Sequence, residues 1–327
     1  MKKILIFSRH GLRYPFFTKT KSLDFFNKDI LNWNDENVGN PTLTKKGALI
    51  ELKFSQWLKD YLKITNNTNL KVIANSTYRT FETAQLLSLG LKPGIETKID
   101  CKDNTFKNED EWFQLKYLNE DYIDWSKLHE YDKTSQDIYK KVNELFKLDN
   151  CKYNNEATNF ELAPEWYKTS GPLFMSSSWS DVLQLKYYLG FPEKEIFNSK
   201  NFIHDLKHLL KAKDRVIDFI FANEKLIKDS EKNVYKLIKH EAQKIEDITL
   251  IVGHDTNIAT ILHMLDIKMP EHNQLEKYPI GSKLIFQFND DNTFNLDYAF
   301  FDYDDIRYFN IDKNPKIIHL GSNLKFK

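Results

Sequence analysis

The chain has 327 residues, of which 41% are hydrophobic and 14% aromatic. This length suits one large domain or a core with a second lobe, and the apolar content excludes a disordered chain. The 47 basic and 47 acidic residues cancel, so overall charge gives no reason to expect nucleic acid or an anionic membrane as a partner. Any binding of an anion must come from a local cluster of charge.

Two features bear on the cellular compartment. Cys101 and Cys151 are too few for a disulfide framework, and we expect reduced thiols. The lysines at the N-terminus precede an apolar run of only Ile4 to Phe7, which is too short for a signal peptide. No run approaches the roughly 18–20 apolar residues of a membrane span. We therefore expect a cytoplasmic protein, or a periplasmic or secreted one if a leader is missing from the sequence.

Three short apolar runs predict strands of a parallel sheet. They are KILIFS (3–8), LKVIANS (70–76) and DITLIVG (247–253), and their hydrophobicity is continuous, as in strands covered on both faces. Helical patterns follow the second and third runs, at 77–91 and 256–265. This order predicts an α/β fold with a central, mostly parallel sheet flanked by helices.

Other elements complete this core. An amphipathic helix is predicted over 42–62, with Thr44 as its N-cap. Near the end of the chain, 283–288 and 293–301 flank the polar sequence NDDN, which predicts a hairpin.

A different pattern occupies residues 105–213. Helical segments at 120–131, 134–148, 177–189 and 200–212 alternate with loops, and strand-like runs are scarce. We predict an α-helical lobe over 105–213, inserted into an α/β core formed by 1–104 and 214–327. The stretch 214–240 predicts one long surface helix that returns to the core.

Charged or titratable side chains follow each predicted strand at its carboxyl end. These are Arg9, His10, Arg13, Arg79, His254 and Asp255. Ligands of open α/β sheets bind at the carboxyl ends of the strands, so these groups converge if the strands are neighbours. Clustered arginines repel one another without an anion, and the planar guanidinium matches phosphate oxygens. Helices that begin near Thr77 and Thr256 would add backbone N–H groups.

Histidine chemistry follows from this cluster. Flanking guanidiniums disfavour an imidazolium, so His10 should be neutral and able to attack phosphorus, forming a phosphohistidine. His254 is expected to donate a hydrogen bond to a phosphate oxygen. Asp255 is placed to protonate the leaving group if a nearby phosphate raises its pKa. No metal or other cofactor is required.

The motifs resemble those of the histidine acid phosphatases, the branch of the histidine phosphatase superfamily that includes glucose-1-phosphatases and bacterial phytases. The matching stretches are RHGLRYP (9–15), LTKKG (43–47), STYRTFETAQ (76–85) and VGHDTNIATIL (252–262). Two more, at 170–192 and 278–288, resemble the glucose-1-phosphatase subgroup. That subgroup has YYEGFP where this chain has YYLGFP, so Leu189 replaces an acidic residue.

The resemblance implies a role for each matching residue. His10 would be the phosphorylated nucleophile and Asp255 the proton donor. The resemblance also implies a phosphoglycerate mutase-like α/β core with a helical lobe over the site. The phosphate-binding side chains would be Arg9, Arg13, Arg79 and His254.

We therefore predict a phosphomonoester hydrolase for small organic phosphates, either sugar phosphates such as glucose 1-phosphate or inositol phosphates. One alternative is a phosphohistidine-dependent phosphotransferase or mutase, although the mutase branch typically resembles HG where this chain has GHD at 253–255. The other is a non-catalytic module that binds a phosphate ligand. The expected partner is a small phosphorylated substrate, with no nucleic acid or membrane, and a homodimer is left open. Aromatic residues either border the pocket, where they would stack on a sugar, or pack in the core. They are Tyr14, Phe16, Phe17, Trp33 and Trp179.

Overall fold

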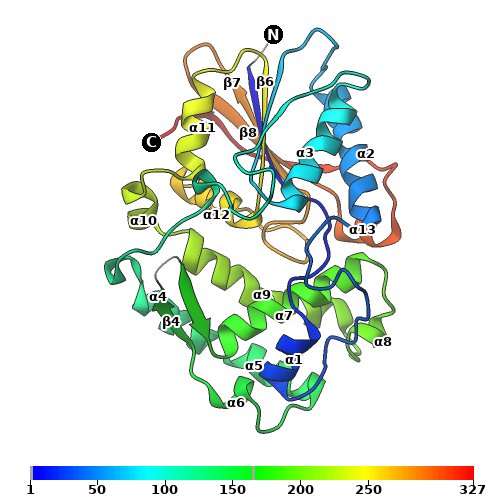
Figure 1. Cartoon of the computed structure of the whole chain (residues 1–327), viewed down its shortest axis with the longest axis vertical. Coiled ribbons are helices and arrows are strands. Elements are labelled where there is room, and N and C mark those ends of the chain that lie inside the picture. Colours follow the sequence, from blue (N-terminus) through cyan, green and yellow to red (C-terminus); the bar gives the residue numbers. More distant parts are fainter. Residues whose placement is uncertain (1–2, 164–165) are drawn as a thin grey trace.

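A seven-stranded sheet forms the centre of the core in the computed structural model, which describes residues 3–163 and 166–327 (Figure 1). The strand order is β3-β2-β6-β1-β7-β8-β9. The strands are β1 (Ile4–Arg9), β2 (Leu70–Ala74), β3 (Ile99–Asp100), β6 (Ile248–Gly253), β7 (Lys283–Phe288), β8 (Phe294–Phe300) and β9 (Lys316–Leu324). The three strands predicted from apolar runs are confirmed as neighbours, since β6 lies between β2 and β1.

The sheet is mixed. Pairings among β3, β2, β6 and β1 are parallel, whereas β7, β8 and β9 add antiparallel pairings. The predicted hairpin is confirmed as β7–β8. The sequence does not predict β9, because an edge strand that is largely exposed carries no apolar run. The α/β class itself is confirmed.

Helices cover both faces of this sheet (Figure 1). On one side lie α2 (Lys45–Tyr61) and α3 (Tyr78–Leu91), and on the other α11 (Val234–Ala242) and α12 (Asp255–Met264). The Thr44 hydroxyl accepts from the backbone N–H of Gly47 at 3.0 Å and caps α2 as predicted. A Cβ at Gly47 would lie 2.1 Å from the carbonyl oxygen of Leu12. The glycine therefore lets α2 touch the loop that follows β1.

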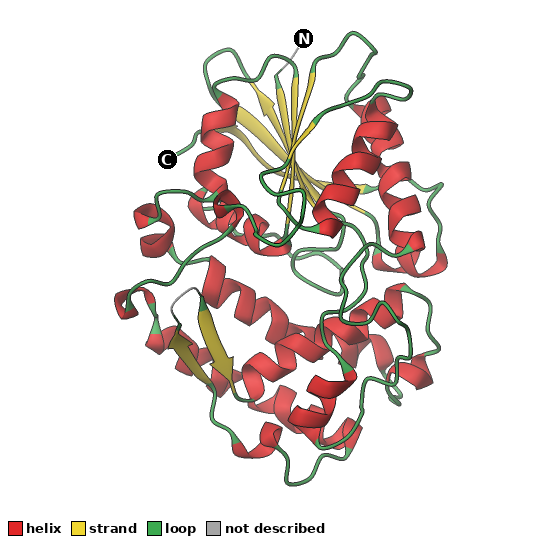
Figure 2. Cartoon of the chain, in the orientation of Figure 1, coloured by secondary structure: helices red, strands yellow, loops and turns green. Residues whose placement is uncertain are grey.

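The lobe lies below the core in Figure 1. It is mostly helical, as the colours of Figure 2 show. Its helices are α1 (Lys19–Phe26), α4 (Trp125–Thr134), α5 (Gln136–Phe146), α6 (Lys152–Asn155), α7 (Pro172–Tyr188), α8 (Glu193–Ile196) and α9 (Phe202–Phe221). A small hairpin of β4 (Asn159–Leu162) and β5 (Tyr167–Ser170) was not predicted. Short 3-10 turns occupy Glu111–Phe113 and Glu120–Tyr122, and α13 (Tyr303–Tyr308) contacts α7 of the lobe.

The prediction of one helix over 214–240 is wrong. That stretch contains the end of α9, then α10 (Glu224–Asp229), then the start of α11. Asparagine side chains cause the breaks, because Asn223 and Asn233 each accept from a backbone N–H three residues ahead. Each thereby caps a new helix.

Among the described residues, no helix combines the length and apolar character needed to cross a membrane. Cys101 and Cys151 are both free thiols.

Candidate active site

The register of the central strands places the two histidines side by side. Arg9 at the end of β1 pairs with Gly253 at the end of β6. The next residues, His10 and His254, therefore leave the same edge of the sheet, and their ring centroids are 5.4 Å apart. The backbone N–H of His10 donates to the carbonyl of Gly253 at 3.0 Å and fixes the start of the loop.

The His10 ring exposes one free nitrogen lone pair to the site. Its Nδ1 lies 2.9 Å from the carbonyl oxygen of Gly11. Because a carbonyl can only accept, Nδ1 carries the proton and Nε2 keeps its lone pair. Burial, followed by the charge of Arg79, holds the pKa of His10 well below its ordinary value. The ring is thus neutral and nucleophilic.

The loop that carries His10 is tightly packed. The backbone N–H of Gly11 donates to the Thr83 hydroxyl at 3.1 Å. A Cβ at Gly11 would lie 2.6 Å from Cγ of Glu51. Glu51 is itself fully buried in an ion pair with Lys283 at 2.8 Å. Only glycine therefore fits at position 11, the last residue of the RHG motif, without displacing this pair.

His254 has the opposite tautomer. The Asn75 Oδ1 accepts from the backbone N–H groups of Ser76 (2.8 Å) and Asp110 (3.0 Å), so its Nδ2 must be the atom that donates to Nε2 of His254 at 2.8 Å. Burial, followed by the charge of Arg79, lowers the pKa of His254 well below its ordinary value. The neutral ring therefore carries its proton on Nδ1, where it can donate to an anion.

Two arginines provide donors that no carboxylate saturates. The Arg79 guanidinium lies 3.4 Å from Nδ1 of His254 and makes no ion pair within 4.0 Å in the described part of the chain. Arg13 contacts Asp181 at 2.9 Å. The Nε atoms of both arginines are buried without a hydrogen-bond partner among the described residues. Burial and then the charge of Arg13 lower the pKa of Arg79 to about 10.

Arg9 points into the protein. Its guanidinium is fully buried and lies 2.9 Å from Asp255 and 2.9 Å from Glu276. It also donates to the backbone carbonyl of Tyr278. Despite burial, these carboxylates raise the pKa of Arg9 above its ordinary value. Arg9 therefore links the predicted proton donor to a buried acidic residue.

The lobe contributes charged groups that the sequence did not reveal. Lys213 of α9 lies 2.7 Å from Asp181 of α7, 2.8 Å from Glu276 and 3.6 Å from Asp255. The site holds four cations and three carboxylates, which leaves one excess positive charge beside the neutral histidines. The cations are Arg9, Arg13, Arg79 and Lys213, and the carboxylates are Asp181, Asp255 and Glu276. Asp181 lies within the stretch 170–192 that resembles the glucose-1-phosphatase subgroup, and Gln184 follows it three residues later on α7; this polar pair is a signal that could have been noticed.

Asp255 is ionised in this arrangement. Burial alone would raise its pKa, but Arg9 and Lys213 outweigh burial and hold the pKa well below the ordinary range. Its Oδ1 also accepts from the backbone N–H of Thr256 at 3.0 Å, at the start of α12. The side chain is thus placed beside the site as a carboxylate.

A cavity of about 240 Å³ opens at this point between the core and the lobe. Its lining residues are Arg13, Phe16, Phe17, Lys21, Ser177, Ser178, Asp181, Lys213, Ile217 and Asp255. Trp33 and Trp179 are instead buried in the hydrophobic core. Leu189 is the C-cap of α7, packs against the same core and does not line this cavity.

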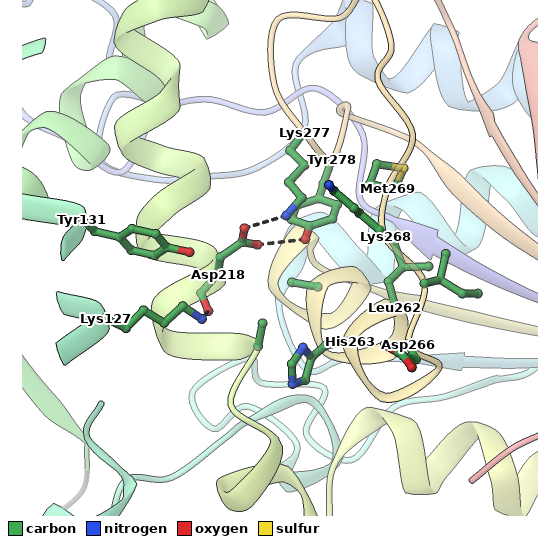
Figure 3. A pocket seen from close by; sticks show the side chains of 13 residues that line it. Lys127, Tyr131, Asp218, Leu262, His263, Asp266, Lys268, Met269, Lys277 and Tyr278 are labelled. Carbon is green, nitrogen blue, oxygen red and sulfur yellow. Dashed lines mark hydrogen bonds and ion pairs between the residues drawn. The ribbon is translucent and has the colours of Figure 1, made fainter. Parts of the chain in front are cut away.

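A second cavity, of about 360 Å³, is lined in part by Tyr278 (Figure 3). There Asp218 of α9 accepts from the Tyr278 hydroxyl at 3.0 Å and from Lys277 at 2.5 Å. None of the six predicted residues lines it, whereas Arg13 and Asp255 line the smaller cavity, so we place the chemistry beside the smaller cavity. The Asp218–Tyr278 bond instead ties the lobe to the residue whose carbonyl holds Arg9.

The structure thus brings all six predicted residues to one edge of the sheet, but the fully buried Arg9 guanidinium is held by Asp255, Glu276 and the carbonyl of Tyr278, so it is not free to bind a phosphate as predicted. The arrangement of the six residues defines an α/β protein with a neutral histidine beside arginines, which is the kind of site that the resemblance of the motifs to the histidine phosphatases implies. No family model matches the chain. Curated relatives and solved structures do match it, and they agree with the resemblance seen in the motifs.

Two curated relatives are similar along most of the chain. The glucose-1-phosphatase of Providencia rettgeri is 26% identical over an alignment of 363 residues, which covers 98% of this chain and 86% of the relative. The glucose-1-phosphatase of Salmonella typhimurium is 25% identical and covers 93% and 80%. Both similarities extend over nearly the whole chain and agree with the resemblance of its motifs to the histidine acid phosphatases.

Solved structures share the fold. The phytase of Citrobacter braakii matches with a TM-score of 0.80 and 16% identity, covering 98% of this chain and 90% of that chain. The Hafnia alvei phytase in complex with myo-inositol hexakis sulphate matches with a TM-score of 0.78, 16% identity and the same coverage. The predicted α/β core with a helical lobe is the fold of these enzymes.

Proposed function

We propose that this chain hydrolyses phosphomonoesters of small organic molecules through a phosphohistidine on His10. The observation that carries the proposal is the His10 Nε2 lone pair, which lies among arginines with unsaturated donors. A cation cluster with one excess charge suits the phosphate of an ester. The names of the curated relatives support hydrolysis, and no observation favours the phosphotransferase or the non-catalytic binding module.

The first step is attack by Nε2 of His10 on phosphorus, in line with the leaving oxygen. The P–N bond forms as the P–O bond to the alcohol breaks. Arg13 and Arg79 would bind the phosphate oxygens, and the Nδ1–H of His254 would donate to a third oxygen. These fixed donors stabilise the charge that spreads over the phosphoryl oxygens in the transition state.

The leaving alkoxide needs a proton, and we assign its delivery to Asp255. The carboxylate is ionised in the free protein, so the proton must come with the substrate. A phosphate ester has a second pKa of about 6, and its negative charge next to Asp255 favours the protonated acid. In the second step Asp255 would take a proton from the water that attacks the phosphohistidine.

Replacement of His10 tests the nucleophile. His10→Ala should release no p-nitrophenol from p-nitrophenyl phosphate above background, whereas wild-type protein quenched with radiolabelled substrate should carry an acid-labile, base-stable phosphate. His204→Ala is the matched control, because that side chain is 81% exposed and lies outside the cavity. A His10→Ala protein with the wild-type rate would remove the mechanism.

A further inference from the structure

A large exposed aromatic ring stands at the mouth of the site. Phe16 directly follows the RHGLRYP motif and remains 46% exposed, although it belongs to the lining of the 240 Å³ cavity. Its ring centroid lies 4.7 Å from Cζ of Arg13 and 4.9 Å from Cζ of Arg79. One ring thus makes cation–π contacts with two guanidiniums that come from different parts of the chain.

These contacts are compatible with phosphate binding. Arg13 and Arg79 repel each other, and the negative face of an aromatic ring attracts both cations. A guanidinium binds an anion through N–H groups in its own plane, whereas it stacks through its face. Phe16 can therefore keep both arginines in place while their edges hold the phosphate.

The same ring is unfavourable for a second phosphate. The π face of Phe16 is negatively polarised and offers no hydrogen bond to an anion. Asp181 and Asp255 add negative charge to the cavity, and Lys213 is already held by carboxylates. Lys21 is the one cation in this lining for which the described residues show no ion pair. The lining therefore lacks the cations that a polyphosphate needs.

The remainder of the cavity suits a small uncharged group. Ser177 and Ser178 offer hydroxyls from α7, and Ile217 offers apolar surface from α9. A volume of about 240 Å³ is below the range of pockets for drug-sized ligands. An aromatic ring beside hydroxyls favours a ring with one apolar face and polar edges, such as a sugar.

We propose that Phe16 is a specificity-determining residue that restricts the substrate to esters with a single phosphate on a small, uncharged, hydroxylated leaving group. The proposal rests on the proposed function of the site. It selects sugar monophosphates over inositol polyphosphates, because Phe16 occupies the place where a further phosphate would need a cation.

Three substrates test this proposal on the full chain. The value of kcat/KM is measured for p-nitrophenyl phosphate, α-glucose 1-phosphate and myo-inositol hexakisphosphate. We expect wild-type protein to prefer glucose 1-phosphate. Phe16→Ala should shift the ratio of the two natural esters toward the hexakisphosphate by about tenfold, the size expected when cation–π contacts are lost. Phe16→Lys should shift this ratio further toward the hexakisphosphate. Phe16→Tyr, which keeps the aromatic ring, should have the wild-type ratio.

The controls separate this proposal from the proposed function. Tyr308→Ala removes another exposed ring that contacts an arginine, Arg307, at 5.7 Å, and it should leave the ratio unchanged. Phe16→Leu repeats the comparison with apolar bulk retained if the alanine variant folds poorly. Absence of p-nitrophenol release by wild-type protein would refute the phosphatase itself. Release of p-nitrophenol with equal use of both natural esters, or an unmoved ratio in Phe16→Ala and Phe16→Leu, would overturn only the role of Phe16.

Discussion

At the residue scale, charge decides what each group near the site can do. His10 and His254 are both kept neutral by burial and by arginines, yet their hydrogen bonds give them opposite tautomers. One therefore has a lone pair to attack with, and the other has a proton to donate. Asp255 is the contrasting case, since Arg9 and Lys213 keep it ionised until a phosphate is bound.

Asp255→Asn tests the assignment of the proton donor. The asparagine cannot supply a proton, so hydrolysis of alkyl phosphates, whose leaving groups are strongly basic, should fall by about 10²–10⁴-fold. Hydrolysis of p-nitrophenyl phosphate should fall less, because its leaving group needs little protonation. The measurement is kcat for both ester types at one pH. Equal losses for the two esters would show that Asp255 does not act as the acid.

At the element scale, the site depends on helices of the lobe as much as on strands of the core. The parallel register of β1 and β6 places the two histidines side by side, while α7 brings Asp181 to Arg13 and α9 brings Lys213 to Asp255. The buried Lys213 compensates three carboxylates from separate elements. Its side chain therefore joins the lobe to the core.

Lys213→Met should destabilise this junction strongly. Breaking a buried ion pair from one side leaves uncompensated charge and costs about 3–5 kcal/mol. Urea denaturation should report this loss in the free energy of unfolding. Lys53→Met is the matched control, because Lys53 pairs with Asp312 at the surface and such pairs contribute little. Similar midpoints for the two variants would contradict a structural role for Lys213.

At the scale of the whole molecule, the buried histidines couple folding to pH. The unfolded chain protonates His254 below its ordinary pKa of 6.5, whereas the folded protein does not. The contribution of His254 to the free energy of unfolding is therefore fully present above pH 6.5, and it decreases as the pH falls below 6.5. Asp214 acts in the opposite sense, because burial raises its pKa to about 7.

A variant isolates the histidine contribution. His254→Asn keeps a residue that can cap α12 but does not titrate. The stability advantage of the wild type over this variant should shrink by about 1 kcal/mol between pH 6.5 and pH 5.5. Urea denaturation of both proteins at each pH measures the difference. An advantage that stays constant or grows as the pH falls would show that His254 is protonated in the folded protein.

Much of the core and of the site could be predicted from local patterns. Continuous apolar runs predict β1, β2 and β6, because a strand covered on both faces has no polar position to spare. The six candidate residues lie at the carboxyl ends of those strands or shortly after them, so their shared edge can be inferred from position alone. The helix breaks at Asn223 and Asn233 could not, because an asparagine cap competes with a helical pattern that continues on both sides.

The sequence by itself determined the fold class and the residues at the strand ends, since these depend on neighbours along the chain. Only the tertiary structure decided the partners of those residues. Glu276, Lys213 and Asp181 reach the site from distant elements, and Phe16 becomes a bridge only when Arg13 and Arg79 lie beneath it. The physical reason is that charge compensation acts through space over a few ångströms, and the distance between two residues in space is set by packing and not by their separation in sequence.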